Sequence, residues 1–311
     1  MKAMVFTKYG PADVLQLDEI ETPVTKNKEV LVKIRATTVT IGDVIIRSGK
    51  HPDSKFFSLM LHIVFGIRKP RNQVLGMELA GEIESVGRDV TRFKIGEKVF
   101  GSTFSLKFGG YAEYKCFPEE SILINMPNNT SYGEAATIPG GGMTALICLR
   151  KGKVNKGKKV LIIGASGAVG TNAVQLAKYF GAVVTGVCST SNLDLVKSLG
   201  ADSVIDYTKE DFTTSREKYD IIFDAVAKIS SRKAKKTLSK NGIYINVLKH
   251  SGSGEKVEDL RFLKELVEQG ELKPVIDRIF SFEEIVEAHK YVEKGHKKGN
   301  VVINIKDEDE T

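Results

Sequence analysis

The sequence predicts an α/β protein in which a β-rich first part is followed by a doubly wound parallel sheet. Short strand-like segments separated by glycine, lysine and aspartate fill residues 1–126. After Pro127, short aliphatic runs alternate with helical patterns, which is typical of parallel βαβ units. The length of 311 residues also exceeds the roughly 100–200 residues of one domain and favours two domains.

The first part is expected to form a barrel-like module of short strands. Residues Val30–Thr37 alternate between apolar and partly polar side chains, which predicts a strand with one buried face. Further strands are expected at Leu79–Gly87, Glu97–Thr103 and Tyr111–Phe117. The apolar stretch Phe56–Ile67 is shorter than the about 20 residues that span a bilayer, and it predicts a core helix or, alternatively, a cover over a pocket.

Strands and helices alternate in the second part. We expect strands at Val160–Ile163, Val183–Val187, Ser203–Tyr207, Ile221–Val226 and Ile243–Val247, with helices at Val169–Phe180, Leu193–Ala201 and Ser231–Lys240. These strands are almost continuously hydrophobic, which indicates helices on both faces of the sheet. The last part predicts helices at Val257–Val267 and Phe282–Val292 and a closing strand at Val301–Ile305.

Three glycines, Gly164, Gly167 and Gly170, mark the point where a predicted strand ends and a helix begins. Glycine permits a tight turn, close approach of a ligand to the backbone, and close packing of helix on strand. The free N–H groups of a helix start favour an anion such as a pyrophosphate. This context predicts a dinucleotide site. Strict GxGxxG spacing would need glycine in place of Ala165, so a structural turn stays the alternative.

The stretch Cys188–Asn192, at the end of the second strand of the sheet, contains no acidic residue. NAD-binding folds commonly place Asp or Glu there, about 20 residues beyond the glycines, to hold the ribose 2′-hydroxyl. A carboxylate would repel a 2′-phosphate, whereas hydroxyl and amide groups accept one by hydrogen bonding. The sequence therefore favours NADP(H) over NAD(H), with the countercharge of the phosphate supplied from outside this stretch.

Composition and charge argue against several other classes of function. The net charge of +7 is spread along the chain, and no basic run carries interleaved aromatics, so nucleic-acid binding is not expected. Three cysteines without a CxxC pair favour a reducing compartment. The start, MKAMVFTKYG, lacks the apolar region of a signal peptide, so we expect a cytoplasmic protein with no membrane partner.

Several stretches resemble the medium-chain dehydrogenase/reductase superfamily, in its zinc-free quinone oxidoreductase branch of zeta-crystallin-like proteins and enone reductases. They are MKAMVFTKYGPADVL, VLGMELAGEIESVGRDVTRFKIGEKVFG, GGYAEY, IPGGGMTAL, LIIGASGAVGTNAVQLAKYFGA, SLGADSVIDY and LKPVIDRIFSFEEIVEAHKYVEKGHKKGNVVI. The resemblance implies a GroES-like catalytic domain of residues 1–126 and 256–311, with a Rossmann domain of residues 127–255 inserted. The active site would lie in the cleft between the two domains.

The resemblance also bears on metal binding and chemistry. Zinc-dependent members bind the metal with a Cys and a His at positions that resemble Thr40 and Met77 of this chain. Neither Thr nor Met is a usual zinc ligand, so we expect no metal. Without a Lewis acid, alcohol oxidation loses its usual support. We therefore expect hydride transfer from NADPH to a small-molecule quinone or α,β-unsaturated carbonyl, on which hydrogen bonds can hold the developing charge.

The matching motifs assign site residues by resemblance. Asp43 closes the early active-site motif, and Thr40 stands where quinone reductases often have Asn. The cofactor residues implied are Thr144 near the nicotinamide amide; Gly164, Ser166, Gly167, Ala168 and Val169 at the pyrophosphate turn; Ser189, Ser191, Asn192 and Tyr207 around the 2′-phosphate; Val226 and Val247 beside the nicotinamide ribose; and Asn300 folding back onto the cofactor. Ordinary packing is the alternative for Thr144 and Tyr207.

Two other functions stay open at this point. No residue is an obvious proton donor, which leaves open a non-catalytic NADPH-binding protein, crystallin-like or RNA-associated. A metal-independent alcohol dehydrogenase is a third alternative, but it lacks an evident base. The segment after Val247 is also shorter than in the family, and Ser251–Gly254 resembles a linker, so the last strand of the nucleotide sheet is missing or replaced. That sheet edge often builds a homodimer in the family, and a homodimer is an open expectation here.

Overall fold

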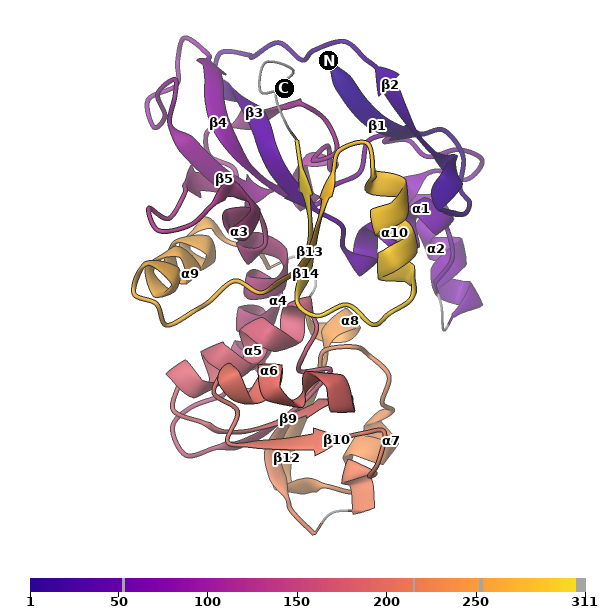
Figure 1. Cartoon of the computed structure of the whole chain (residues 1–311), viewed down its shortest axis with the longest axis vertical. Coiled ribbons are helices and arrows are strands. Elements are labelled where there is room, and N and C mark those ends of the chain that lie inside the picture. The colour runs from indigo at the N-terminus through magenta and orange to yellow at the C-terminus, as the bar shows by residue number, and fades with distance from the viewer. Residues whose placement is uncertain (52–53, 215, 252–253, 306–311) are drawn as a thin grey trace. The chain divides into compact units, whose positions relative to one another are not determined.

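The computed structural model describes residues 1–51, 54–214, 216–251 and 254–305 (Figure 1). The chain divides into two compact units. Unit 1 comprises Met1–Pro139 together with the chain from Ile276 onward, and unit 2 comprises Gly140–Val275. The domain boundaries that we expect after residues 126 and 255 stay a prediction, because compact units need not be domains that fold independently.

Unit 1 is built mainly from β-strands, as the sequence predicts. Its elements are β1 (Lys2–Phe6), β2 (Leu15–Glu19), β3 (Glu29–Thr38), α1 (Ile41–Ser48), α2 (Lys55–Phe65), β4 (Glu78–Val86), β5 (Lys98–Ser102), β6 (Tyr114–Pro118), β7 (Leu123–Asn125), α3 (Tyr132–Ala136), β13 (Ile276–Ser281), α10 (Ile285–Glu293) and β14 (Asn300–Asn304), with 3₁₀ turns at Ala12–Val14 and Phe104–Leu106.

Strand β3 lies at the centre of unit 1 because segments from both ends of the chain pair with it. Among the described residues, the main sheet has the order β13-β14-β3-β4-β5-β7, and β6 also pairs with β3. Val302 of β14 lies opposite Thr38 of β3 in antiparallel register. Figure 1 shows β13 and β14, in yellow, beside the indigo β3. The final strand of the sequence therefore completes a sheet that the first part of the chain begins.

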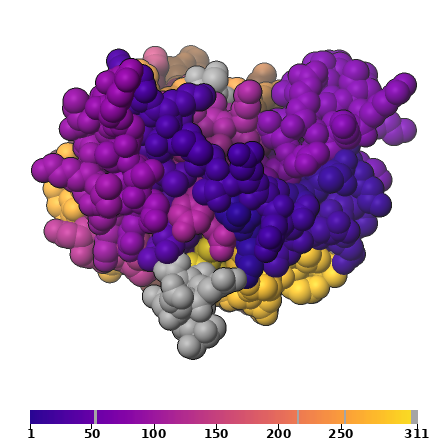
Figure 2. All heavy atoms as spheres, turned by 90° about the horizontal axis from the view of Figure 1, so that it is seen from above, coloured from indigo at the N-terminus to yellow at the C-terminus, as the bar shows by residue number. Residues whose placement is uncertain are grey.

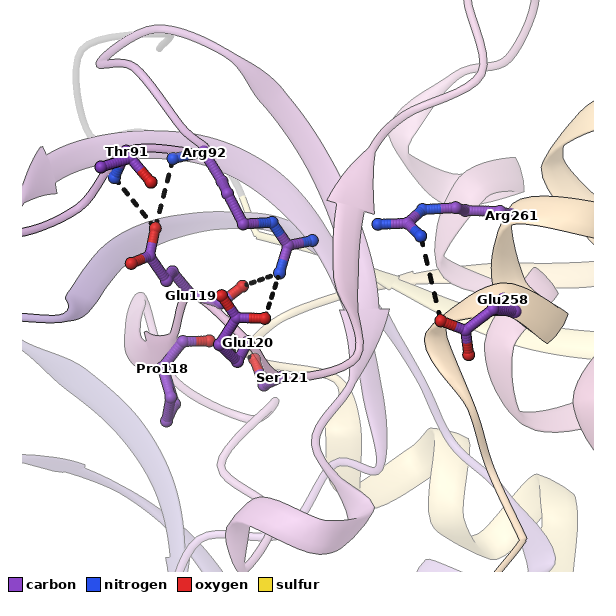
Figure 3. Close-up of polar contacts among 8 residues, drawn as sticks. All are labelled: Thr91, Arg92, Pro118, Glu119, Glu120, Ser121, Glu258 and Arg261. Atoms are coloured by element: carbon purple, nitrogen blue, oxygen red, sulfur yellow. Dashed lines mark hydrogen bonds and ion pairs between the residues drawn. The ribbon is translucent and has the colours of Figure 1, made fainter.

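Glu119, directly after β6, fastens the loop that contains Thr91 and Arg92 (Figure 3). Its Oε2 accepts hydrogen bonds from the backbone N–H groups of Thr91 (2.9 Å) and Arg92 (3.2 Å), and Arg92 Nη1 donates to the Glu119 carbonyl oxygen (2.6 Å). These N–H groups, that of Thr91 first, lower the pKa of the Glu119 carboxyl, and the Arg92 charge adds to the effect. An ionised carboxylate therefore holds this loop at neutral pH.

Unit 2 is the parallel α/β unit that the sequence predicts. Its elements are α4 (Ile138–Lys151, which begins in unit 1), β8 (Lys159–Ile163), α5 (Ala168–Tyr179), β9 (Val183–Cys188), α6 (Leu193–Ser198), β10 (Ser203–Asp206), β11 (Tyr219–Asp224), α7 (Ser231–Ala234), β12 (Leu238–Asn246), α8 (Val247–His250) and α9 (Val257–Glu268), with 3₁₀ turns at Thr190–Asn192 and Phe212–Thr214.

The register of the unit 2 sheet aligns the carboxyl ends of its strands. Among the described residues, the order is β10-β9-β8-β11-β12, and every neighbouring pair is parallel. Asp206 lies opposite Cys188, and Ile163 lies opposite both Val187 and Asp224. Ligands of doubly wound sheets bind at this carboxyl edge, so the loops that follow these residues form the candidate ligand site of unit 2.

The helix predicted over Ser231–Lys240 is wrong beyond Ala234, where α7 ends. Strand β12 begins at Leu238, which pairs with Tyr219 of β11 and packs against the core of unit 2. Packing of an apolar side chain in the sheet outweighs the helix propensity of the lysine-rich run, a preference worth about 0.7 kcal/mol per residue at most.

The prediction of a core helix over Phe56–Ile67 is right about the helix and wrong about its burial. Helix α2 forms there, but none of its eleven residues, all of them described, is buried. Leu61 and Phe65 pack partly against the core of unit 1. Leu59 and Val64 are more than half exposed, so the apolar composition of the segment does not reflect a place in the core.

The shortened segment after Val247 is present as the sequence indicates. Among the described residues, β12 is the last strand of the unit 2 sheet, and α9 begins at Val257. Of the predicted linker, Ser251 and Gly254 are described, whereas Gly252 and Ser253 lie outside the described residues.

Candidate dinucleotide site and active site

The glycine turn of unit 2 leaves room for nothing larger than glycine at two of its positions. Gly164, directly after β8, has a φ of +77°, and a Cβ there would overlap with the Val226 side chain. A Cβ on Gly170 would overlap with the carbonyl oxygen of Gly164. Gly164 therefore permits the turn, and Gly170 lets α5 lie directly against the end of β8.

The start of α5 suits an anion. Gly167 is the N-cap residue, and among the described residues no side chain caps the helix in its place. The first intrahelical bond runs from Thr171 N–H to the Gly167 carbonyl oxygen (2.9 Å), so the N–H groups of Ala168 and Val169 precede the helical ladder. With glycines where the backbone must come close to a ligand, these donors fit a pyrophosphate.

A cluster of hydroxyl and amide groups lies at the carboxyl ends of β8 and β9. Asn192 Nδ2 donates to Ser166 Oγ (3.0 Å) and to Ser189 Oγ (3.2 Å), while Ser191 Oγ donates to Asn192 Oδ1 (3.4 Å). Asn192 is buried, so its amide fixes the serines of two separate loops in one place. The structure thus brings together four of the residues that the sequence assigns to the cofactor.

Asp206 at the end of β10 is an acid that the sequence reasoning missed. Its carboxylate accepts hydrogen bonds from Thr190 Oγ1 (2.5 Å) and Thr208 Oγ1 (2.6 Å), which lower its pKa to about 2. Lys209 Nζ lies 3.7 Å from the same carboxylate. The acid-free stretch Cys188–Asn192 therefore has a negative and a positive charge beside it. The aspartate in SVIDY was the sequence signal that could have identified this acid. It ends the third strand of the sheet, and in the observed strand order the third strand lies next to the second.

Three further predicted residues of unit 2, Tyr207, Val226 and Val247, lie along the same edge. Tyr207 is exposed, and its N–H donates to the Cys188 carbonyl oxygen (3.1 Å). Val226 lies against Gly164, two residues beyond the end of β11, and Val247 follows the end of β12. Thr144 is half-buried on α4, and packing stays the alternative for it.

In unit 1, Thr40 and Asp43 form the capping box of α1. Thr40 Oγ1 accepts from the Asp43 N–H (3.1 Å), while Asp43 Oδ2 accepts from the Thr40 N–H (3.0 Å) and from Thr40 Oγ1 (2.6 Å). Thr40 is half-buried, whereas Asp43 is completely buried. The early motif therefore has a structural role in starting a helix, and it also presents one hydroxyl backed by a carboxyl group.

Burial raises the pKa of Asp43 to about 6, even though hydrogen bonds from Thr40, from the Gly76 N–H (3.0 Å) and from Tyr111 oppose the rise. The Tyr111 hydroxyl also lies 3.2 Å from Nε2 of the buried His289. Burial, followed by the nearby Arg47 charge, lowers the pKa of His289 to about 3, so its ring is neutral at physiological pH. Tyr111 and His289 are further members of this polar group that sequence reasoning missed, because they follow Asp43 by 68 and 246 positions.

The two positions that carry zinc ligands in the resembled family lie side by side. Thr40 Oγ1 lies 3.5 Å from Met77 Sδ. A hydroxyl group and a thioether are not a donor set that Zn²⁺ favours, so these residues do not fit the metal. Within the residues that the structure describes, no three His, Cys, Asp or Glu side chains are grouped as metal ligands.

The predicted site residues belong to both units. Thr40, Asp43 and Asn300, which is buried at the start of β14, lie in unit 1, and all the others lie in unit 2. Each unit therefore gathers its own part of the predicted site. Within the described part of the chain, no helix has the length and apolar character needed to cross a membrane.

Three family models match most of the chain. The alcohol dehydrogenase GroES-like domain matches residues 26–128. Two models described as zinc-binding dehydrogenase match residues 168–265 and 250–303. These matches cover the β-rich part, the parallel sheet and the returning end of the chain.

Individual relatives extend over almost the whole chain. It is 36% identical to the 2-methylene-furan-3-one reductase of Solanum lycopersicum, over 98% of this chain and 79% of that protein. It is 32% identical to a chloroplastic NADPH-dependent alkenal/one oxidoreductase of Arabidopsis thaliana, over 97% and 79%. Among solved structures, the quinone oxidoreductase of Coxiella burnetii is similar with a TM-score of 0.87 and 30% identity, over 98% of this chain and 99% of that one.

Proposed function

The chain belongs to the medium-chain dehydrogenase/reductase superfamily, and from that premise we propose that it uses NADPH to reduce a C=C bond conjugated to a carbonyl, or a quinone. The observation that carries this proposal is the similarity over nearly the full chain to relatives named for enone, alkenal and quinone reduction. The donor set at Thr40 and Met77 supports it, because reduction of an electron-poor acceptor needs no metal at those positions.

The residues of unit 2 would hold the cofactor at the carboxyl edge of the sheet. The N–H groups at the start of α5 would bind the pyrophosphate, and Ser189, Ser191 and Asn192 would hydrogen-bond to the 2′-phosphate. Lys209 supplies the nearby positive charge that the serine-rich stretch lacks. The bound dinucleotide supplies a hydride for the acceptor carbon.

The residues of unit 1 would manage the proton that the reduction also requires. Hydride addition to the β-carbon of an enone leaves negative charge on the carbonyl oxygen and the α-carbon, and one proton completes the product. The hydroxyl of the half-buried Thr40 donates a hydrogen bond to the completely buried Asp43. When Asp43 is protonated, Thr40 can pass its proton to the substrate and take one from Asp43.

The direct test is to measure NADPH oxidation with a panel of enones, quinones, aldehydes and alcohols, using NADPH deuterated at C4. We expect turnover with enones or quinones, and deuterium at the β-carbon of an enone product. Calorimetric binding of NADPH without turnover on any acceptor would instead favour the non-catalytic, crystallin-like function. Turnover with aldehydes or alcohols alone would favour an alcohol dehydrogenase.

A substitution at Thr40 tests the proton step. Thr40→Val should lower kcat by about 100-fold and abolish the decline of kcat that we expect in the wild type above about pH 6. Thr40→Ser keeps the hydroxyl and the helix cap and should retain most of the activity. The dissociation constant of NADPH should be the same in all three proteins. An unchanged pH profile in Thr40→Val would remove Thr40 and Asp43 from the mechanism.

The function requires a small molecule as partner. A homodimer and a cytoplasmic location are finer parts of the proposal, and sedimentation velocity tests the first of them. A monomer at all accessible concentrations would agree with the expectation that the last strand of the nucleotide sheet is missing or replaced.

A further inference from the structure

Helix α2 exposes apolar side chains to solvent, where a helix on a protein surface normally exposes polar ones. Its inner side, with Leu61, His62 and Phe65, rests on unit 1, where His62 packs edge-on against Tyr9 with ring centroids 4.5 Å apart. Apart from Lys55 at its start, the exposed residues of α2 carry no charge. The outer apolar set, between 47% and 72% exposed, consists of Phe56, Phe57, Leu59, Ile63, Val64 and Ile67.

This apolar face belongs to a firmly attached element. Tyr9 Oη donates to the Gly66 carbonyl oxygen (2.7 Å) at the end of α2, and Phe65 lies against Phe108 with ring centroids 5.8 Å apart. Figure 2 shows the violet atoms of this segment projecting at the upper right, beyond the dark blue N-terminal residues. An ordinary surface helix places polar residues outward, so exposed apolar residues gathered on one helix indicate an interaction surface.

The charges around the helix are almost all positive. Between Gly49 and Gln73 the sequence contains five Lys or Arg residues and a single acid. The turn after α2 brings the basic residues back to the helix end, because the Arg71 N–H donates to the Phe65 carbonyl oxygen (2.7 Å). Basic residues beside α2 also suit its carboxyl-terminal dipole, but the dipole gives no reason for the exposed phenylalanines.

We propose that α2 docks this protein onto an anionic lipid surface. A helix that lies in the membrane interface combines exposed Phe, Leu and Ile with flanking Lys and Arg, and anionic headgroups attract such cations. The apolar face enters the boundary between headgroups and acyl chains, while Lys55, Arg68, Lys69 and Arg71 lie at headgroup level. This departs from the expectation of no membrane partner.

Vesicle binding by the intact chain tests this proposal. Vesicles of phosphatidylcholine with phosphatidylglycerol should bind the protein about tenfold more tightly than pure phosphatidylcholine vesicles. The triple variant Phe56→Ser, Leu59→Ser, Ile63→Ser should lose this binding. The matched control Val24→Ser, Ile95→Ser, Ile279→Ser removes three exposed apolar residues elsewhere and should bind like the wild type.

A charge pair and a fluorescence reporter complete the test. Arg68→Glu with Lys69→Glu should abolish the preference for anionic vesicles, whereas the equal charge change Lys235→Glu with Lys236→Glu should leave it intact. The chain has no tryptophan, so Leu59→Trp gives a single reporter whose emission should shift to the blue on vesicle binding, unlike Ile95→Trp. Equal binding by both triple variants, or no binding to anionic vesicles, would overturn the proposal. A third result would also overturn it: the wild type is a dimer that does not bind vesicles, and the α2 triple variant is a monomer. That result would assign the apolar face of α2 to contact with a second copy of the chain.

Discussion

At the scale of single residues, Asp43 shows how one side chain combines local and long-range roles. The capping box that it forms with Thr40 is readable from the sequence, because the two residues are three positions apart. Its complete burial and its contacts with Gly76 and Tyr111 come from distant segments. Burial therefore raises the pKa of the carboxyl group, and the hydrogen bonds from the motif residue Thr40 and from the distant Gly76 and Tyr111 oppose the rise.

The raised pKa of Asp43 predicts a specific pH dependence of stability. A carboxyl whose pKa rises from 3.8 to about 6 on folding holds its proton more tightly in the folded state. It therefore stabilises the fold fully below about pH 4, and this contribution is lost as the pH rises through about 6. Relative to Asp43→Asn, the free energy of unfolding of the wild type should fall by about 2 kcal/mol from pH 4 to pH 7.

Denaturant titrations at a series of pH values measure this difference. The exposed Asp18→Asn is the matched control, and its difference from the wild type should change little over the same range. If Asp43→Asn and the wild type respond to pH in parallel, Asp43 does not titrate in this range.

Lys209 makes a second prediction at the residue scale. Its ammonium group lies beside Asp206 and near Thr190, at the edge where we place the 2′-phosphate. Lys209→Ala should raise the dissociation constant of NADPH by about tenfold and leave that of NADH nearly unchanged, because NADH has no 2′-phosphate. Isothermal calorimetry measures both, with Lys197→Ala as an exposed control on α6. A loss of affinity that is equal for NADPH and NADH would place the 2′-phosphate elsewhere.

At the scale of elements, two glycines in the turn between β8 and α5 have different roles, one in packing and one in ligand binding. A Cβ on Gly170 would meet the Gly164 carbonyl oxygen, whereas a Cβ on Gly167 would only reach it at 3.6 Å, an ordinary contact. Gly170 is therefore needed for packing. Packing within the protein does not require glycine at position 167. The glycine there is better explained by a ligand that comes close to the backbone.

The two glycines should respond differently to the same substitution. Gly170→Ala should lower the free energy of unfolding by about 2 kcal/mol, because α5 must move away from β8. Gly167→Ala should leave the thermal midpoint nearly unchanged and raise the dissociation constant of NADPH by about tenfold. Thermal denaturation by circular dichroism and calorimetry measure the two effects. Equal stability losses in both variants would contradict a ligand-facing role for Gly167.

At the scale of the whole molecule, unit 1 depends on a strand from the far end of the chain. Strand β14 lies between β13 and β3, and its residue Ile303 is completely buried in the core of unit 1. The first part of the sequence therefore cannot complete its core without residues that follow unit 2.

Truncation of one side chain in β14 tests this dependence. Ile303→Ala should lower the free energy of unfolding of unit 1 by about 3 kcal/mol, through the cavity that it leaves. Ile279→Ala in the neighbouring β13 removes the same atoms from an exposed position and should change stability by less than about 1 kcal/mol. Urea denaturation followed by circular dichroism provides the comparison. Similar losses in both variants would show that β14 contributes little to the core.

The sequence by itself determined the strands and helices with clear periodicity, the glycine turn and the hydroxyl and amide groups of the cofactor edge. These features depend on neighbours within a few positions, so local patterns carry them. The tertiary structure alone decided that Asp206 and Lys209 lie beside Thr190. It also decided that Tyr111 contacts both Asp43 and His289, and that α2 is exposed. The physical reason is that strand order and burial arise from contacts between distant segments. An apolar run has the same composition whether a core covers it or not.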